Sequence, residues 1–237
     1  MHLEVGPRII IRFSNGIFIT ETVFWAVIVA VCMIIFALVA TRNLKQYPRG
    51  VQLVCEIIVG FVYNFVKKTM GKHCVNYAPF IGSLFFFLLF CNALGLIGQR
   101  AATADVNFTF AMSIMIFFVI QLSGIRSRGI KGYLKHYAEP FAMMIPIKIL
   151  EEIVFPISLA FRLFGNILAG FIIYELFMHL MATVSSNLHL PIPLLQIGSP
   201  LPVNLFFDIF EPVLQAFVFS MLAMVFISRA VLIRDQK

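Results

Sequence analysis

Five long stretches of the chain consist almost entirely of apolar residues. Each is close to or longer than the roughly 20 residues that a helix needs to cross a hydrocarbon core about 30 Å thick. Within them, apolar and polar residues do not alternate as they would along the strands of a membrane barrel. The pattern predicts an all-α, polytopic membrane protein with five crossings, at residues 17–40, 78–97, 108–125, 149–184 and 203–227.

Residues 49–70 follow a different pattern, in which apolar and charged positions interleave. The apolar residues recur at helical spacing: Val51, Val54, Ile58, Phe61 and Phe65. The positions between them carry Arg49, Gln52, Glu56, Asn64, Lys67 and Lys68. A sixth crossing would bring too many of these charges into lipid, so we expect an amphipathic helix lying at the membrane interface.

The composition excludes a water-soluble fold and narrows the class of protein. Hydrophobic residues make up 61% of the chain and charged residues only 12%, whereas soluble domains carry about 25% charged residues. No long polar stretch is left over for a soluble module, so we expect one membrane domain over residues 1–237. The net charge of +7 lies in short connections between apolar runs, where it reports topology and does not indicate nucleic-acid binding.

The basic residues are distributed unevenly between alternate connections, which predicts the orientation in the membrane. One set of connections holds 14 of the 18 Lys and Arg: residues 41–77, 126–148 and 228–237. The other set holds three: residues 1–16, 98–107 and 185–202. We therefore expect the N-terminus outside and the C-terminus in the cytoplasm.

Arg162 is the remaining basic residue, and it lies inside the fourth apolar stretch. A charge at such a depth costs about 2.5–3.5 kcal/mol on insertion scales and therefore needs a reason. At 100° per residue, one narrow helical face gathers small and polar residues around it: Ser158, Arg162, Gly165, Asn166 and Ala169. Another backbone can approach this face closely. The alternative is a structural arginine that pairs with a carboxylate of its own chain or extends to the interface.

The last apolar stretch carries a second polar stripe. It consists of Asn204, Asp208, Glu211 and Gln215, spaced 4, 3 and 4 residues apart. A carboxylate in such a setting can carry a proton instead of remaining a fixed anion. Asp208 also fits the interface or the start of the helix. Pro212, directly after Glu211, frees a backbone carbonyl and favours a hydrated kink.

Other polar residues within or beside the spans are less specific. Glu175 and His179 are four residues apart and more than 90° from the Arg162 face, so they line a separate water path or form a simple pair. Glu151 and Glu152 form either a cation entry at the cytoplasmic start of the fourth span or a solvated face. Gln121 fits an interhelical hydrogen bond. No phosphate loop, HExxH or nucleophile elbow is present, so the chain alone should not be a hydrolytic enzyme.

The segment Phe161–Gly170 resembles subunit a of F-type ATP synthases, the stator of the membrane rotary motor. The resemblance continues in Gln215–Phe219, in Gly124–Gly129 and in Ile149–Glu151, and it covers about residues 20–230. The loops are similar to those of bacterial members, with a Firmicutes-like character. The resemblance implies a multi-pass protein of a bacterial plasma membrane.

The resemblance also implies partners and roles. Arg162 would face an oligomeric ring of small hairpin rotor subunits, each bearing a buried carboxylate, and would separate two aqueous half-channels for protons or Na⁺. Asn166 and Gln215 would be its polar neighbours, and Glu151 matches a glutamate near the cytoplasmic side. The peripheral-stalk subunit b would be a further partner, and no cofactor is implied.

The sequence departs from the family at one position. Many members carry an acidic residue or histidine directly after the Ala-Gly of the arginine motif, whereas Phe171 occupies that place here. The outer half-channel would then use other groups. Asp208 occupies the family's ionisable position seven residues before the glutamine, and Glu175, Glu211 and His179 are further candidates.

A different class of function remains open from the residues alone. In a stand-alone ion channel or secondary transporter, Arg162 would bind an anionic substrate and the carboxylates would carry the coupling ion. A stable complex with a ring of small hairpin subunits would favour the stator, whereas substrate uptake by the lone chain would favour the transporter.

Overall fold

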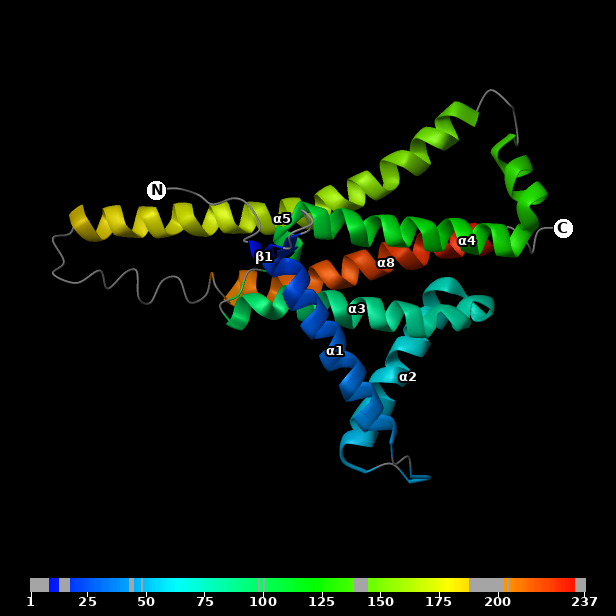
Figure 1. Cartoon of the computed structure of the whole chain (residues 1–237), viewed down its shortest axis with the longest axis horizontal. Helices are drawn as coiled ribbons and strands as arrows, with labels where there is room; N and C mark the ends of the chain where they lie inside the picture. Colours follow the sequence, from blue (N-terminus) through cyan, green and yellow to red (C-terminus); the bar gives the residue numbers. More distant parts are fainter. Residues whose placement is uncertain are drawn as a thin grey trace.

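A computed structural model describes residues 9–12, 18–42, 45–47, 49–97, 99, 101–138, 145–187, 203 and 205–232. Apart from one short hairpin, the regular structure in this part of the chain is helical (Figure 1). Five helical segments are long and apolar enough to cross a membrane: Glu21–Thr41, Lys72–Ile97, Val106–Ile130, Ile145–Ser186 and Glu211–Val231. The predicted all-α polytopic architecture is confirmed.

The first crossing begins later than the apolar pattern indicated. Strand β1 (Ile9–Arg12) pairs antiparallel with β2 (Phe18–Thr20), and α1 runs over Glu21–Thr41. The Thr20 hydroxyl accepts a hydrogen bond from the Val23 amide at 3.4 Å and caps the helix. Residues 18–20, which we expected inside the span, therefore precede it because their backbone bonds to another strand, and Ile17 lies outside the described residues.

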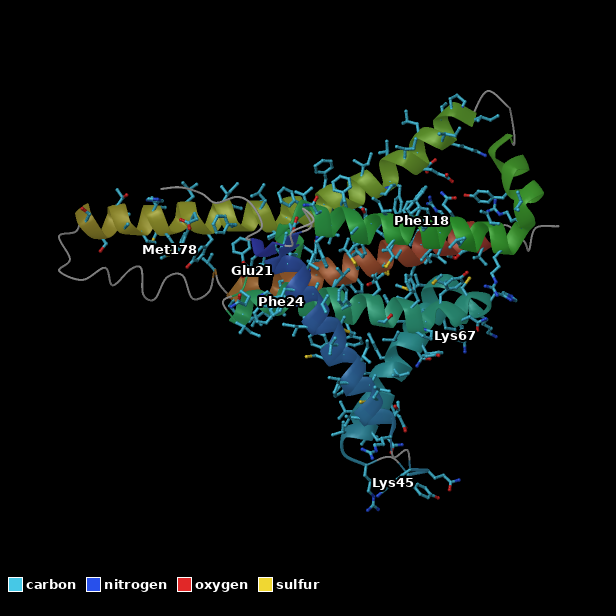
Figure 2. All side chains as sticks on the ribbon, in the orientation of Figure 1. Glu21, Phe24, Lys45, Lys67, Phe118 and Met178 are labelled. Atoms are coloured by element: carbon cyan, nitrogen blue, oxygen red, sulfur yellow. The ribbon has the colours of Figure 1, made fainter. Side chains whose placement is uncertain are left out.

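Helix α2 (Val51–Met70) forms a hairpin with α1, and Lys45 lies in the turn between them (Figures 1 and 2). Its last turns pack into the core through the buried Val66 and Met70, while Val54 and Phe61 are exposed. The helix expected over residues 49–70 is thus present, and it is not among the five apolar segments. Its position at the interface stays a prediction.

Three helices form the centre of the bundle. Helix α3 (Ala78–Asn92) follows a 3₁₀ turn η1 (Lys72–Tyr77), and it packs against α8 (Glu211–Leu232), which also contacts α4 (Val106–Ala138). Their facing side chains are fully buried: Leu88, Ile116, Phe219 and Met224. Two 3₁₀ turns, η2 (Ala93–Ile97) and η3 (Ala102–Ala104), connect α3 to α4.

The basic segment 126–131 meets the end of α8. The Arg128 Nη2 group donates to the carbonyls of Arg229 and Ala230 at 3.3 and 3.2 Å, and the Ser127 hydroxyl donates to the Val231 carbonyl at 3.3 Å. A cationic side chain is favourable there because the last carbonyls of a helix lack intrahelical donors. Two of the basic connections therefore lie at the same end of the bundle.

Helix α4 turns sharply within this segment (Figure 1). Gly129 has φ 73° and ψ 161°, a conformation that only glycine adopts easily. The predicted span 108–125 lies before the turn. The remaining residues of α4 form a short helical arm that points in a new direction.

Helix α5 (Ile145–Asn187) is the longest element, with 43 residues. At about 1.5 Å per residue it is roughly 65 Å long, about twice the thickness of a hydrocarbon core. Pro156 lies inside it, and the ribbon changes direction along its length (Figure 1). Such a helix fits a bilayer only if it runs obliquely or extends beyond the lipid.

The expected last span, 203–227, is not one regular helix. A π-helical turn η5 (Phe206–Phe210) precedes α8. Pro212 has no N–H, so the Asp208 carbonyl cannot receive the usual i→i−4 bond, and the backbone relaxes into a wider turn. The regular crossing starts at Glu211 and extends beyond residue 227.

Replacing Gly129 by Ala should destabilise the chain by about 1–3 kcal/mol, because alanine is strained at this φ and ψ. The matched control is Gly60→Ala in α2, where an added Cβ has no neighbour within 4 Å and helix propensity improves by up to about 1 kcal/mol. Thermal unfolding of the purified chain in detergent measures both. Equal midpoints for the two variants would contradict the assigned turn.

Candidate functional site

Arg162 lies on an open face of α5. Beside this face, α5 is packed through Leu159 and Leu163, which are almost fully buried. The residues that share the arginine's face are exposed: Ser158, Asn166 and Ala169. The face expected from helical periodicity is therefore present, and the rest of the described chain does not cover it.

No ion pair to Arg162 is present among the described side chains. The structural alternative, an arginine neutralised by a carboxylate of its own chain, gains no support in that part of the protein. At Gly165, on the same side, an added Cβ would meet no atom within 4 Å. The site thus combines a permanent charge with free space beside the backbone.

Gln215 connects the arginine segment to α8. Its side chain is only 2% exposed. Asn166 Nδ2 donates to Gln215 Oε1 at 2.9 Å, and Gln215 Nε2 donates to the Arg162 carbonyl oxygen at 3.5 Å. A buried amide needs such partners, because an unsatisfied one costs about 1–3 kcal/mol. The three residues expected to be neighbours are brought together.

A second contact lies one turn further along both helices. A Cβ at Gly170 would lie 2.9 Å from Glu211 Oε2 and 2.8 Å from Phe207 Cδ1, so a larger residue there would require these two side chains to shift. Gly170 is four residues after Asn166, and Glu211 is four residues before Gln215. The two segments therefore pair antiparallel, and the Glu211 carboxylate lies against the backbone of α5.

The rest of the predicted stripe stays a prediction. Asn204 and the side chain of Asp208 lie outside the described residues. The prediction that all four polar residues share one face assumed a regular α-helix. The π-helical turn over Phe206–Phe210 changes the rotation per residue before Glu211, whereas Glu211 and Gln215 both lie in α8 and keep the expected relation.

Glu175 and His179 lie further along α5, away from Arg162. Glu175 is half-buried and His179 is exposed. Figure 2 places the neighbouring Met178 on the part of α5 that extends past the central helices. Phe171 is exposed directly after Gly170. Across the helix interface, the Glu211 carboxylate lies against Gly170, the residue directly before the departure from the family pattern.

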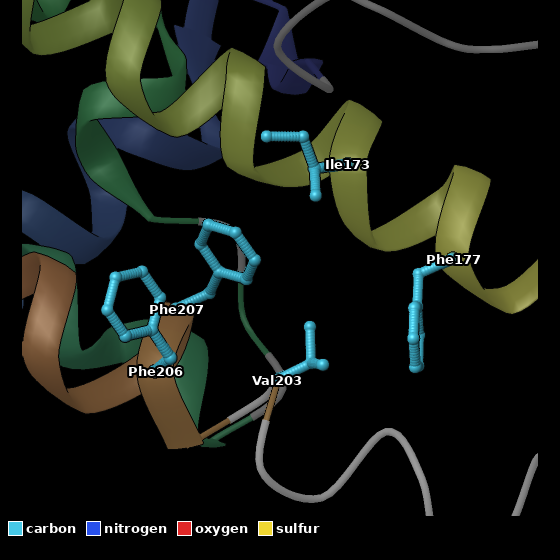
Figure 3. A pocket seen from close by; sticks show the side chains of 5 residues that line it. All are labelled: Ile173, Phe177, Val203, Phe206 and Phe207. Atoms are coloured by element: carbon cyan, nitrogen blue, oxygen red, sulfur yellow. The ribbon is translucent and has the colours of Figure 1, made fainter.

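An apolar hollow of about 310 Å³ adjoins the Gly170 contact. It lies between α5 and the start of η5 (Figure 3). Its lining consists of Ile173, Phe177, Val203, Phe206 and Phe207. Phe207 belongs both to this lining and to the Gly170 contact, and all five lining side chains are apolar, so they offer no ligand to an ion.

A polar cluster lies near the opposite end of the bundle. Gln121 Nε2 on α4 donates to Glu152 Oε2 on α5 at 3.0 Å, which confirms the expected interhelical hydrogen bond of Gln121. The Tyr133 hydroxyl, after the turn in α4, contacts both side chains. Glu151, the residue singled out by resemblance, is exposed. The sequence pattern did not predict a role for Tyr133. The feature that could have indicated it is Gly129, because a glycine there permits the chain to turn back toward Gln121.

The chain matches proteins of one family over most of its length. The model of the family described as ATP synthase A chain matches residues 23–228. An ATP synthase subunit a of Moorella thermoacetica is 33% identical over 208 residues, covering 87% of this chain and 88% of the relative.

Two further relatives extend the comparison. An ATP synthase subunit a 2 of a Bradyrhizobium species is 34% identical over 229 residues, covering 96% of this chain and 92% of the relative. A chloroplastic ATP synthase subunit a of Stigeoclonium helveticum is 33% identical over 211 residues, covering 84% and 79%. This multi-pass membrane chain therefore belongs to the ATP synthase A chain family, that is, to subunit a of the F-type ATP synthases.

Proposed function

We propose that this chain carries protons or Na⁺ between two half-channels and the carboxylates of a rotor ring, and that Arg162 keeps the two paths apart. The observation that carries the proposal is the open face around Arg162, with free space at Gly165 and no covering element in the described chain. Such a face suits the close approach of another helix. The ring of small hairpin subunits is the partner that we assign to it.

The chemistry of arginine supports this role. Each elementary charge that moves through 100 mV releases about 2.3 kcal/mol, so an ion that leaks past the rotor wastes that energy. A fixed cation between the paths repels passing cations. Arginine forms a strong pair with a carboxylate that has released its ion, and it does not lose its own proton. A lysine in a dry site can become neutral and would separate the paths less well.

The hydrogen bonds of Gln215 support a fixed position for this charge. One of its amide atoms bonds to Asn166 and the other to the backbone of Arg162. Since α8 is packed into the bundle through Ala216 and Phe219, the arginine segment is tied to a rigid element. The guanidinium itself stays outside this packing, where a rotor carboxylate can reach it.

For the outer half-channel we assign the central role to Glu211. It contacts α5 at Gly170, beside the position where Phe171 replaces the usual polar residue. Glu211 thus lies one helical turn from Gln215, the residue that bonds to Asn166 and to the backbone of Arg162. Asp208, Glu175 and His179 are the remaining candidates for the outer side.

For the inner half-channel we assign Glu151 and Glu152, near the start of α5. Their end of the bundle also holds the basic segment 126–131 and the end of α8, which we place in the cytoplasm. The N-terminus is then outside, and the membrane is a bacterial plasma membrane. The peripheral-stalk subunit b is the further partner.

Replacing Arg162 by Lys or Ala should reduce ion-driven ATP synthesis to background, because neither residue keeps a permanent charge that pairs in two-pronged fashion with a carboxylate. Synthesis is measured with the assembled complex in membrane vesicles under an imposed ion gradient. Arg42→Lys, at the end of α1, is the matched control. Coupled synthesis at the control rate in either Arg162 variant would refute the proposal.

Replacing Glu211 by Gln should lower the synthesis rate by about tenfold or more, since proton transfer through a positioned side chain typically contributes 10²–10⁴-fold. Glu211→Asp keeps the carboxylate and should retain part of the rate. Glu56→Gln on the exposed part of α2 is the control. If Glu211→Gln supports the same rate as Glu56→Gln, the outer path does not use this residue.

A further inference from the structure

We propose that Tyr133 is a positioning residue of the inner ion path, which holds the carboxylate of Glu152 in place together with Gln121. The inference rests on the proposed function, because it concerns how one of the two half-channels is built. It assigns a role to a side chain that lies outside the arginine motif and outside the five apolar runs.

The position of Tyr133 depends on the turn at Gly129. Tyr133 follows Gln121 by 12 residues, which would separate the two by about 18 Å along a straight helix. Instead, the Tyr133 hydroxyl donates a hydrogen bond to Gln121 Oε1. The positive φ of Gly129 reverses the chain between them and brings the short arm of α4 back onto its own helix.

The ring of Tyr133 is fixed by close packing. A Cβ at Gly124 would lie 2.7 Å from its Cε2 and 3.2 Å from its Cδ2. The same added carbon would be 3.7 Å from the Ala230 methyl group, at the end of α8. Gly124 therefore provides the space for the ring, and three segments meet around it. The hydroxyl is directed by this packing and not only by its hydrogen bonds.

The cluster holds both oxygens of the Glu152 carboxylate. Gln121 Nε2 donates to Oε2 at 3.0 Å, and the Tyr133 hydroxyl lies 3.3 Å from Oε1. The hydroxyl has one proton, which it shares between Gln121 and Glu152. A carboxylate with a donor at each oxygen keeps one orientation. Glu151, the adjacent carboxylate, is exposed, so Glu152 is the one with a defined geometry.

This geometry suits a carboxylate that exchanges ions with the cytoplasm. The Glu152 carboxylate lies between α4 and α5, at the end of the bundle that holds the basic segments. It is half-buried and not fully solvated. Further charged residues occupy the neighbouring turns of α4 and α5 and the adjoining end of α8: Arg126, Arg128, Lys148, Glu151 and Arg229. The hydrogen bonds of Tyr133 and Gln121 set how Glu152 responds to these charges.

The test is ATP-driven ion pumping by the assembled complex in inverted vesicles, over a pH series. Tyr133→Phe keeps the ring at Gly124 and removes only the hydroxyl, so we expect normal assembly, a several-fold lower pumping rate and a displaced pH profile. Glu152→Gln should also lower the rate. In the double variant, Tyr133→Phe should have no further effect, because its target is already lost. Gln121→Leu, which removes the other donor, is a second variant with the same expected result.

Tyr63→Phe, on the exposed face of α2, is the matched control and should leave the profile unchanged. The inference fails if Tyr133→Phe pumps with the rate and pH profile of Tyr63→Phe, or if its effect is the same in the presence and absence of Glu152. These results would leave the proposed function intact. That proposal fails separately, if Arg162 variants remain coupled.

Discussion

The hydrogen bonds of a single buried amide, Gln215, connect the charged segment of α5 to the core of the bundle. Asn166 donates to its oxygen, and its nitrogen donates to the Arg162 carbonyl. Leaving either half of a buried amide unpaired is costly, so these bonds specify which turn of α5 lies against which turn of α8. The antiparallel pairing then places Glu211 against Gly170. The arginine side chain remains outside this contact and open to a partner.

Hydrophobic periodicity was sufficient to predict the helices and the arginine face. Apolar runs of the length of a bilayer have few structural alternatives, because each backbone polar group in lipid needs an internal partner. The residues around Arg162 share a face by helical geometry alone, and Gln121 was expected to bond to another helix. The pairing of Asn166 with Gln215 followed from resemblance and not from the pattern itself.

The features that the sequence did not predict depend on tertiary contacts and backbone irregularities, which the pattern of apolar residues does not reveal. Phe18–Thr20 are as apolar as a helix start, yet they pair with a strand. The loss of one donor at Pro212 produces a π-helical turn, which changes the rotation per residue before Glu211. The contact of Glu211 with Gly170 requires two helices to be placed together. Tyr133 was missed because only the positive φ of Gly129 brings it back to Gln121.

The central claim is that Arg162 prevents ions from passing between the two paths without rotation of the ring. The most direct test is passive ion flux through the assembled membrane sector, with the ring covalently cross-linked to the stator so that it cannot turn. With Arg162 present, we expect no flux above that of empty vesicles; with Arg162→Ala, we expect a leak through the locked complex. Equal tightness of the two locked complexes would contradict the claim.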